Sequence, residues 1–313
     1  MAENFINVSN LTYCGKEAEE IFVKNLYKSD LKAYGIRYMS GVKGRMKLMS
    51  GEVGDLFQAY TCPFSPDGDV ILSEEFIEPT AIKVNLEACY SDFWNTYMVE
   101  QTEITLNGGI PQMFFDWFFN KVLIEKLAIE YEEIFWNGDT DYSGSTKQYL
   151  KLADGIVKKI AENENSVKVS GAALTTANIM GIIGEVAAAV DDLDIDVENY
   201  KVFVNYKDYR KLLTALGNES PTSIQIWANF SRENGKVFAY GMEIVPSRIA
   251  ANTVLAAEPA HLVLGYDVAD AETYYKLIDM RETTLDNTFR VGVLTNIAVG
   301  AIYPAYAVIA RPE

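Results

Sequence analysis

The pattern of hydrophobic and polar positions divides the chain of 313 residues into regions of different character. From Glu17 to Tyr34, apolar residues recur at close to helical spacing among Glu and Lys, and Gly35 follows as a stop signal. From Val42 to Leu86, Gly and Pro separate short alternating pieces, which predicts β-hairpins. This second region has few large apolar residues for its length. We therefore expect it to project from the body and to need a partner surface that covers it.

The strongest helical signal runs from Pro111 to Trp136. Pro111 stands where a first helical residue is expected, and neither Gly nor another Pro occurs before Asn137-Gly138 supplies a stop. Met113 to Phe119 is apolar on nearly all sides, which predicts that this half of the helix, including Trp117, is buried. Charged residues interrupt every apolar run of the length that a membrane span requires, so we interpret the helix as internal to the protein.

The remainder of the chain contains two further helical runs and a series of strands. Helices are predicted at Leu174 to Val190 and at Tyr206 to Leu216, with a strand at Lys201 to Val204 between them. Further strand-like pieces, separated by Gly, Pro, Asn or Asp, are Val237 to Val245, Val254 to Ala257, Leu262 to Leu264, Tyr274 to Ile278 and Phe289 to Ile309. This order predicts an α+β fold and not a βαβ alternation.

Composition places the chain among globular proteins, with 49% hydrophobic and 23% charged residues, and its length predicts more than one sub-domain. The formal net charge of −17 repels phosphate backbones and anionic lipid, which argues against sequence-specific DNA reading. Met1 to Ser9 lacks the positive charge and the apolar stretch of a secretory signal, so export is not indicated.

The cysteines and the histidine suggest no metal site. Cys14, Cys62 and Cys89 are widely separated, which suits free thiols in a reducing cytoplasm. His261 is the sole histidine, and this severely limits His-based triads and multi-histidine metal sites. We interpret His261 as a partly exposed side chain near a turn.

Two acidic stretches have part of the spacing of a cation site. Asp139 to Gly144 resembles the first half of a calcium loop, but Leu150 occupies the position at which a bidentate Glu would close the cage. A solvated loop is therefore favoured. The second stretch consists of Asp191, Asp192, Asp194, Asp196 and Glu198. Val197 stands where a calcium loop would need Gly, so we favour a solvated helix end and keep a weak intersubunit cation site as the alternative.

One short segment resembles a nucleic-acid-binding motif, and the common catalytic motifs are absent from the sequence. Gly41-Val42-Lys43-Gly44 has the GXXG shape of a KH clamp but lacks a surrounding KH pattern, so a turn is favoured. The basic residues around it are Lys32, Arg37, Lys43, Arg45 and Lys47. No phosphate loop, dinucleotide fingerprint, nucleophile elbow or zinc-protease motif occurs. The adjacent acids Glu74-Glu75 and Glu132-Glu133 are expected to face different directions. We assign no catalytic, cofactor-binding or metal-ligating residue and interpret the chain as not an enzyme.

A series of short segments spans most of the chain. They are Ala59 to Gly68, Lys83 to Cys89, Ile134 to Asp139, Leu152 to Ile156, Tyr240 to Pro246, Leu264 to Asp267 and Phe289 to Gly300. In this order, and together with the order of elements, they resemble the major capsid proteins of tailed bacteriophages, which have the Hong Kong 97-like capsid fold. The resemblance rests on the order of the segments, because each one alone is unspecific.

The resemblance implies a division of the chain into the named parts of that fold. Residues 1–44 would form the N-terminal arm and residues 45–86 the extended E-loop. Residues 87–160 would form the peripheral domain, with the spine helix at 111–136. Residues 161–265 would form the axial domain, and residues 266–313 would return to the peripheral sheet. Lys83 matches no cross-linking motif, so no covalent cross-link is predicted.

The resemblance also implies a role as a structural protein of the virion. Copies of the chain would self-assemble into hexamers and pentamers that form the icosahedral head around phage DNA, in the cytoplasm of the bacterial host. The implied partners are the portal protein, a separate scaffolding protein, decoration proteins and non-specifically contacted double-stranded DNA, with no membrane. An encapsulin-type nanocompartment shell protein is the near alternative, and an intracellular acidic hydrolase is the distant one.

Overall fold

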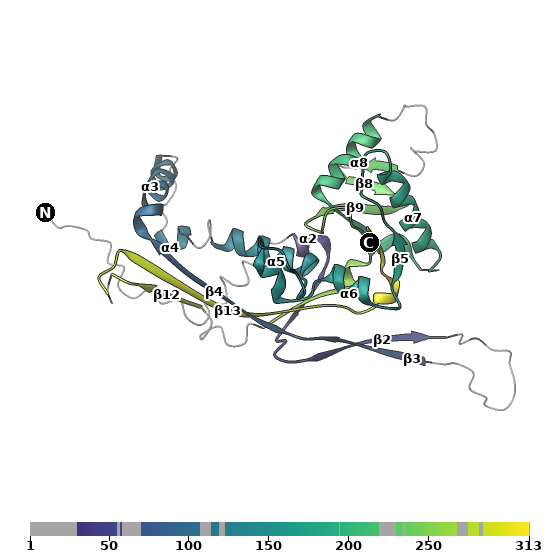
Figure 1. The fold of residues 1–313 in the computed structure, drawn as a ribbon, viewed down its shortest axis with the longest axis horizontal. Helices are drawn as coiled ribbons and strands as arrows, with labels where there is room; N and C mark the ends of the chain where they lie inside the picture. The colour runs from purple at the N-terminus through teal and green to yellow at the C-terminus, as the bar shows by residue number, and fades with distance from the viewer. Residues whose placement is uncertain are drawn as a thin grey trace. The chain divides into compact units, whose positions relative to one another are not determined.

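The computed structural model describes residues 30–54, 57, 70–106, 114–118, 123–193, 195–218, 230–233, 236–267, 275–281 and 284–312. The chain divides into two compact units. The first contains residues 1–29, 80–131 and 266–297, and the second contains residues 30–79, 132–265 and 298–313. Helices and sheets occur together in an α+β arrangement (Figure 1), as the order of sequence signals predicts.

The first unit is built on a three-stranded antiparallel arrangement. Its strands are β4 (Thr80–Cys89), β12 (Tyr275–Asp279) and β13 (Thr288–Ala301). β13 pairs with β4 on one side and with β12 on the other, so it is the central strand. One face of β13 is buried through Phe289, Val291 and Val293. Arg290, between the first two of them, and Leu294, directly after Val293, are exposed, which is the alternation expected of a half-buried sheet.

Helices cover the buried face of this sheet with aromatic side chains. They are α3 (Tyr90–Leu106), α4 (Phe114–Trp117) and the beginning of α5 (Ile124–Asn137), which ends in the second unit. The Phe289 ring lies 4.9 Å from that of Phe118 and 5.1 Å from that of Tyr90. Trp117 is buried as predicted, and its Nε1 donates to Glu100 Oε2 at 2.7 Å. This unit therefore has its own aromatic core.

The predicted helix from Pro111 to Trp136 appears as two α-helical pieces in the described residues. α4 and α5 both fall inside it, and Phe118 and Leu123 have the wider π-type turn. Residues 111–113 and 119–122 lie outside the described residues, including the expected start at Pro111. The predicted stop is confirmed, because α5 ends at Asn137 and Gly138 N donates to Ile134 O at 2.9 Å.

The second unit contains a seven-stranded mixed sheet in the order β5-β14-β10-β6-β9-β8-β7. The strands are β5 (Val167–Ser170), β6 (Lys201–Asn205), β7 (Phe230–Glu233), β8 (Lys236–Ala239), β9 (Met242–Ser247), β10 (Val254–Ala257) and β14 (Val308–Arg311). β5 runs parallel to β14 and β6 parallel to β9, and the other described pairs are antiparallel. α7 (Ile179–Asp191) and α8 (Tyr206–Asn218) share a large apolar core with this sheet.

Smaller elements complete the second unit. They are α2 (Leu31–Tyr34), β1 (Arg37–Ser40), β11 (Leu262–Asp267), α6 (Ile156–Glu162) and 3-10 turns at Gln148–Leu152, Val197–Asn199, Pro259–His261 and Pro304–Tyr306. β1 pairs with β11. The predicted N-terminal helix lies outside the described residues up to 29, and its end is α2. Gly35 caps it with φ +94°, a backbone angle that favours glycine.

A hairpin forms the remaining part of the second unit. β2 (Met46–Val53) and β3 (Val70–Ile77) pair antiparallel from Met46 opposite Ile77 to Val53 opposite Val70. Among the described strands they pair only with each other, and Figure 1 shows them as a long two-stranded ribbon. Leu48 and Ile77 anchor its base in a small apolar cluster with Val42, Val263, Ala298 and Ile302. The predicted hairpin is thus confirmed in the described residues.

Three predicted elements differ most in their bounds, for local reasons. The strand predicted from Phe289 to Ile309 is two strands, β13 and β14, because the 3-10 turn Pro304–Tyr306 separates them. The helix predicted from Leu174 begins only at Ile179, because Asn178 Oδ1 accepts a hydrogen bond from Thr175 N at 2.7 Å and closes a turn there. The strand predicted from Val237 to Val245 is a hairpin of β8 and β9, since Tyr240 and Gly241 both have positive φ and form a tight turn.

Candidate functional site

The loop that resembles a calcium site is occupied by a lysine. Lys158 Nζ lies 2.7 Å from Asp139 Oδ1, 2.7 Å from Asp141 Oδ2 and 3.0 Å from Asp154 Oδ1. The hydrogen bond from Lys158 holds the pKa of Asp139 below its usual value. Leu150 takes part through its carbonyl, which accepts from Asp139 N at 2.8 Å. The Lys158 ammonium group takes the place that a metal cation would have among these carboxylates. The loop therefore forms an internal cluster of ion pairs.

In the described residues, the acidic stretch from Asp191 to Glu198 is largely solvent-exposed, and the GXXG segment from Gly41 to Gly44 is held by packing. Asp191, Asp192 and Glu198 are exposed, and Asp196 Oδ1 accepts from Glu198 N at 3.0 Å; Asp194 lies outside the described residues. Val42 of the GXXG segment is fully buried in the cluster at the base of the hairpin. That burial gives Gly41 to Gly44 a packing role, because its central apolar side chain is not available to a ligand.

The histidine and the described cysteine show no catalytic arrangement. His261 is partly buried, ends the turn Pro259–His261 and has its Nε2 at 3.3 Å from Glu258 Oε2. Burial lowers the pKa of His261 although Glu258 raises it. Cys89 is a free thiol at the end of β4, and Cys14 and Cys62 lie outside the described residues. Within the described ranges, no group of three His, Cys, Asp or Glu residues is arranged to hold a metal ion.

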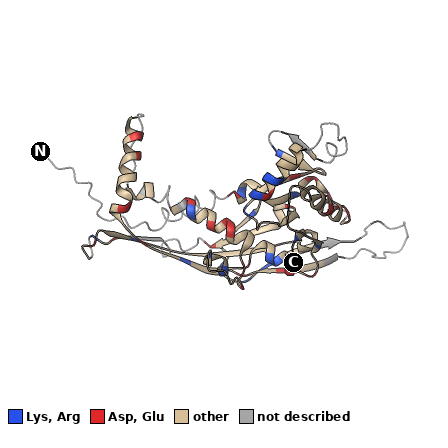
Figure 2. Ribbon diagram, turned by 45° about the horizontal axis from the view of Figure 1, so that its top comes forward, with Lys and Arg blue, Asp and Glu red and all other residues tan. Residues whose placement is uncertain are grey.

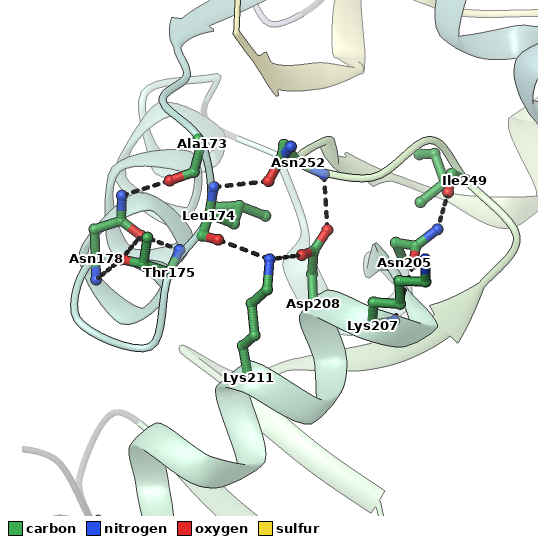
Figure 3. A network of polar contacts seen from close by, with 10 residues as sticks. All are labelled: Ala173, Leu174, Thr175, Asn178, Asn205, Lys207, Asp208, Lys211, Ile249 and Asn252. Carbon is green, nitrogen blue, oxygen red and sulfur yellow. Dashed lines mark hydrogen bonds and ion pairs between the residues drawn. The ribbon is translucent and has the colours of Figure 1, made fainter.

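A polar network joins α8 to the segment before α7 (Figure 3). Asp208 is completely buried and its Oδ1 lies 2.6 Å from Lys211 Nζ, while its Oδ2 accepts from Asn252 N at 2.7 Å. Lys211 Nζ also donates to Leu174 O at 2.8 Å, and Asn252 Oδ1 accepts from Leu174 N at 2.9 Å. Both oxygens of this buried carboxylate are paired, which is typical of a structural network.

Glu132 lies near the end of α5 and is buried, with 2% of its surface exposed. Its Oε2 accepts a hydrogen bond from Arg248 Nε at 3.2 Å, whereas its Oε1 has no hydrogen-bond partner among the described residues. Burial raises the pKa of Glu132 to about 7; Arg248 lowers it and Asp30 raises it. The neighbouring Glu133 pairs instead with Lys147 Nζ at 2.8 Å. The two adjacent carboxylates therefore face different directions, as predicted.

Polar contacts attach the segment at residues 30–34 to the second unit. Tyr34 OH donates to Pro246 O at 3.0 Å, and Lys201 Nζ donates to Tyr34 O at 2.9 Å. Tyr206 OH donates to Asp30 Oδ2 at 3.2 Å. Leu31 is fully buried. The chain is thus anchored at the point where residues 1–29 join it.

Exposed apolar side chains gather on two elements, one in each unit. On the hairpin, Met49 is 61% exposed and Leu72 is 62% exposed, and Phe57, in the connection between the strands, is fully exposed. On α3, the exposed apolar residues are Trp94, Met98, Val99 and Leu106. α3 carries acidic residues and no Lys or Arg (Figure 2). Such surfaces are typical of protein–protein contacts.

The described part of the chain contains no helix that is both long and apolar enough to cross a membrane. Comparison of the sequence with protein-family models and with curated proteins found no match.

Comparison with solved structures shows the fold. A chain of the satellite phage P4 procapsid, a structure that includes the size determination (Sid) protein, matches with a TM-score of 0.64 and 12% identity, covering 97% of this chain and 93% of that chain. The capsid of Myoviridae phage XM1 matches with a TM-score of 0.51 and 12% identity, covering 91% and 92%. A virus-like particle from Pyrococcus furiosus matches with a TM-score of 0.50 and 11% identity, covering 94% and 98%. The chain has the fold of phage capsid proteins, and the predicted resemblance is confirmed at that level.

Proposed function

We propose that this chain, which has the fold of phage capsid proteins, is the major capsid protein of a tailed bacteriophage. Copies of it form hexamers and pentamers that close into an icosahedral head around phage DNA. The chain acts as a structural protein and not as an enzyme. The observation that carries the proposal is a likeness to capsid chains that extends over more than nine tenths of this chain and of the capsid chains compared.

The described contacts support a role in assembly. The hairpin of β2 and β3 lies within residues 45–86, the segment that we assign to the E-loop, and one of its faces, with Met49 and Leu72, is exposed while its base packs into an apolar cluster. We propose that the other parts of the capsid fold are the N-terminal arm at 1–44, the peripheral domain at 87–160 with its spine helix at 111–136, the axial domain at 161–265 and the return strands of the peripheral domain at 266–313. Met49 and Leu72 would be covered by neighbouring subunits, which stabilises the shell by about 25 cal/mol per Å² of apolar surface buried.

The charge of the chain suits the same role. The net charge of −17 keeps free subunits soluble and opposes premature association. The proposed partners are the portal protein, a separate scaffolding protein, decoration proteins and, without sequence specificity, the enclosed DNA. The mature location would be the virion, after assembly in the cytoplasm of the host.

Electron microscopy of the expressed full chain, alone and with its scaffold, tests the proposal. We expect closed shells or sheets of capsomers. The double substitution Met49→Ser with Leu72→Ser should abolish or strongly reduce assembly, whereas the matched control Met49→Leu with Leu72→Met, which keeps the apolar surface, should assemble. A wild-type chain that stays monomeric under every assembly condition would contradict the proposal.

A cellular nanocompartment shell of the encapsulin type is the second candidate. The likeness to the virus-like particle from Pyrococcus furiosus, which covers 98% of that chain, favours it. The contents of particles isolated from the native source separate the two functions. Nuclease-protected DNA of genome length would support the phage capsid, and a stoichiometric cargo protein without DNA would support the nanocompartment.

A further inference from the structure

The helix α3 has one packed side and one exposed side. Its packed side consists of Tyr90, Tyr97 and Gln101, which are the buried residues of this helix. These positions are seven and four residues apart, so they lie on one strip of an α-helix with 3.6 residues per turn. The opposite side of α3 is therefore turned away from the aromatic core of the first unit.

The exposed side of α3 combines apolar and acidic residues. Its members, at intervals of seven, four and three positions and about half a turn from the buried strip, are Asp92, Val99, Glu103 and Leu106. Val99 is 59% exposed and Leu106 is 82% exposed. No ion pair joins Asp92 or Glu103 to another residue in the described part of the chain, and α3 contains no Lys or Arg (Figure 2). A partner for this side should be apolar and basic.

The three-stranded sheet of the first unit has an exposed face with that character. The strand register places Leu294 opposite Lys83, and it places Arg290 between Ile278 and Glu87. Opposite residues of an antiparallel pair lie on the same face, and so do residues four positions apart on one strand. These side chains therefore share one face of the sheet, on which Ile278 is 44% exposed and Leu294 is 40% exposed.

The described side chains of this sheet face leave one positive charge without a partner. Arg290 Nε lies 2.8 Å from Glu87 Oε2, so these two charges compensate each other. Lys83 is exposed and forms no ion pair with another described residue. An uncompensated base thus lies beside the apolar Leu294, whereas uncompensated acids lie beside the apolar residues of α3. The two surfaces are complementary in charge and alike in apolar character.

The spacing of the apolar residues also agrees between the two surfaces. Val99 and Leu106 lie about 10 Å apart along the helix, at a rise of about 1.5 Å per residue. Leu294 lies about 13 Å along β13 from the position opposite Ile278, at a rise of about 3.3 Å per residue. A helix laid on the open face of a sheet is one of the common layer arrangements of proteins.

α3 packs on the other face of its own sheet, so a second copy must supply the sheet face that it contacts. The Tyr90 ring of α3 lies 5.1 Å from the ring of Phe289, and Phe289 is buried in the aromatic core. The exposed side of α3 and the exposed face of the sheet in one molecule are thus turned away from each other. Each of them is available to a neighbouring molecule.

We propose that the exposed side of α3 in one copy of the chain docks on the exposed face of the three-stranded sheet in a second copy. Val99 and Leu106 contact the apolar residues of the sheet, and the acids of α3 lie near Lys83. The contact joins two different surfaces, so it is heterologous and repeats from copy to copy. The inference rests on the proposed function and deepens it, because it names one contact through which the subunits associate.

A disulfide between two different full-length chains tests this contact. One chain carries a heavy nitrogen isotope and Val99→Cys, and the other is unlabelled and carries Leu294→Cys. Both are made in a background in which Ser replaces the natural cysteines, Cys14, Cys62 and Cys89. Because the two introduced cysteines are on different chains, a mixed disulfide reports only a contact between copies. We expect mass spectrometry to detect it after the chains are mixed under assembly conditions and oxidised.

Further variants test the face of the helix and the charge. Thr105→Cys, exposed on a flank of α3, is the matched control for Val99→Cys and should give at least about tenfold less mixed disulfide. Adding Lys83→Glu to the Leu294→Cys chain brings like charges together and should lower the yield about tenfold. Adding Glu103→Lys to the Val99→Cys chain should then restore the yield.

Electron microscopy of the same samples separates this inference from the proposed function. Shells without the mixed disulfide would overturn the docking contact and leave the capsid function in place. A mixed disulfide without shells or capsomers would support the contact and count against the capsid function. A disulfide between two Val99→Cys chains, or a yield that Lys83→Glu leaves unchanged, would overturn the docking contact, because α3 would then face a different surface.

Discussion

The hairpin of β2 and β3 and the seven-stranded sheet region belong to the same unit but are stabilised differently. In the sheet region, α7 and α8 bury a continuous apolar core, and even the carboxylate of Asp208 is completely paired inside it. In the hairpin, Leu48 and Ile77 pack into the apolar cluster at its base, whereas Met49 and Leu72, on the opposite face of the ribbon, are exposed. One region buries its apolar side chains within the chain, and the other leaves two of them exposed.

This difference separates residues that maintain the fold from residues that are available for association. A substitution in a self-packed region should change the stability of the subunit, because it opens a cavity or forces a clash. A substitution on the outer part of the hairpin should change association while leaving the subunit folded. Substitutions in the two kinds of region test that separation, and their expected effects on stability run from several kcal/mol down to almost none.

Trp117→Ala, in the aromatic core of the first unit, should have the largest effect. Because the side chain is 3% exposed and its Nε1 donates to Glu100, we expect a loss of about 3–5 kcal/mol in the free energy of unfolding. Chemical denaturation measures it. Trp94→Ala is the matched control, since Trp94 is 43% exposed, and should cost clearly less. Equal losses of unfolding free energy in the two variants would show that Trp117 is not part of a buried core in the first unit.

Glu132→Gln should stabilise the chain in a pH-dependent way. Because burial raises the pKa of Glu132 from 4.5 to about 7, its contribution to stability is fully present below about pH 4.5 and is lost as the pH rises to about 7. Gln stays neutral throughout, so the variant should be more stable than the wild type above about pH 7, by up to about 3 kcal/mol. Denaturation curves of both proteins across this range measure the difference. A constant difference at all pH values would contradict it.

Gly155→Ala tests the close backbone packing behind α5. A Cβ at Gly155 would lie 2.6 Å from Gly138 N and 2.8 Å from Ile134 O, so we expect a loss of about 1–3 kcal/mol. Gly44→Ala, where a Cβ meets nothing within 4 Å, is the control and should be nearly neutral. Thermal unfolding of the two variants measures the contrast, and a neutral Gly155→Ala would mean that the segments are not in contact.

The double substitution Met49→Ser with Leu72→Ser should have the smallest effect on stability. Both side chains are more than half exposed, so the free energy of unfolding of the unassembled subunit should change by less than about 0.5 kcal/mol. Denaturation of the monomer measures it, alongside the assembly defect proposed above. A large loss of monomer stability would mean that the hairpin packs on its own subunit, and would remove the contrast between the two regions.

Much of the fold could be predicted because the relevant signals are local. Alternation predicts most of β4, the β-rich piece from Phe289 predicts the start of β13 but not its end at Ala301, and the stop at Asn137-Gly138 marks the end of α5. α3 gave no usable signal, because it is rich in Tyr, Phe, Trp and Thr, which favour strands, and buries only a narrow strip through Tyr90, Tyr97 and Gln101. Its helical state depends on the aromatic core that it packs against.

The candidate site was less predictable because its partners are distant in sequence. The spacing of Asp139 to Gly144 indicated a cation, and the structure supplies one from Lys158, on a helix whose approach the local pattern does not show. Glu132 was noted only as half of an acidic pair. Its neighbours Asp30 and Arg248 lie about a hundred residues away on either side, so its burial and its raised pKa follow from tertiary packing alone.

Oxidative footprinting of Met49 tests the central claim most directly, because it reports whether the outer hairpin is covered in the subunit or only in the particle. Hydroxyl radicals are applied to unassembled subunits and to assembled particles, and Met49 oxidation is measured by mass spectrometry, with the buried Met242 as the internal control. We predict rapid oxidation of Met49 in the free subunit and about tenfold protection in the particle. Protection already in the free subunit, or equal rates in both states, would contradict the account.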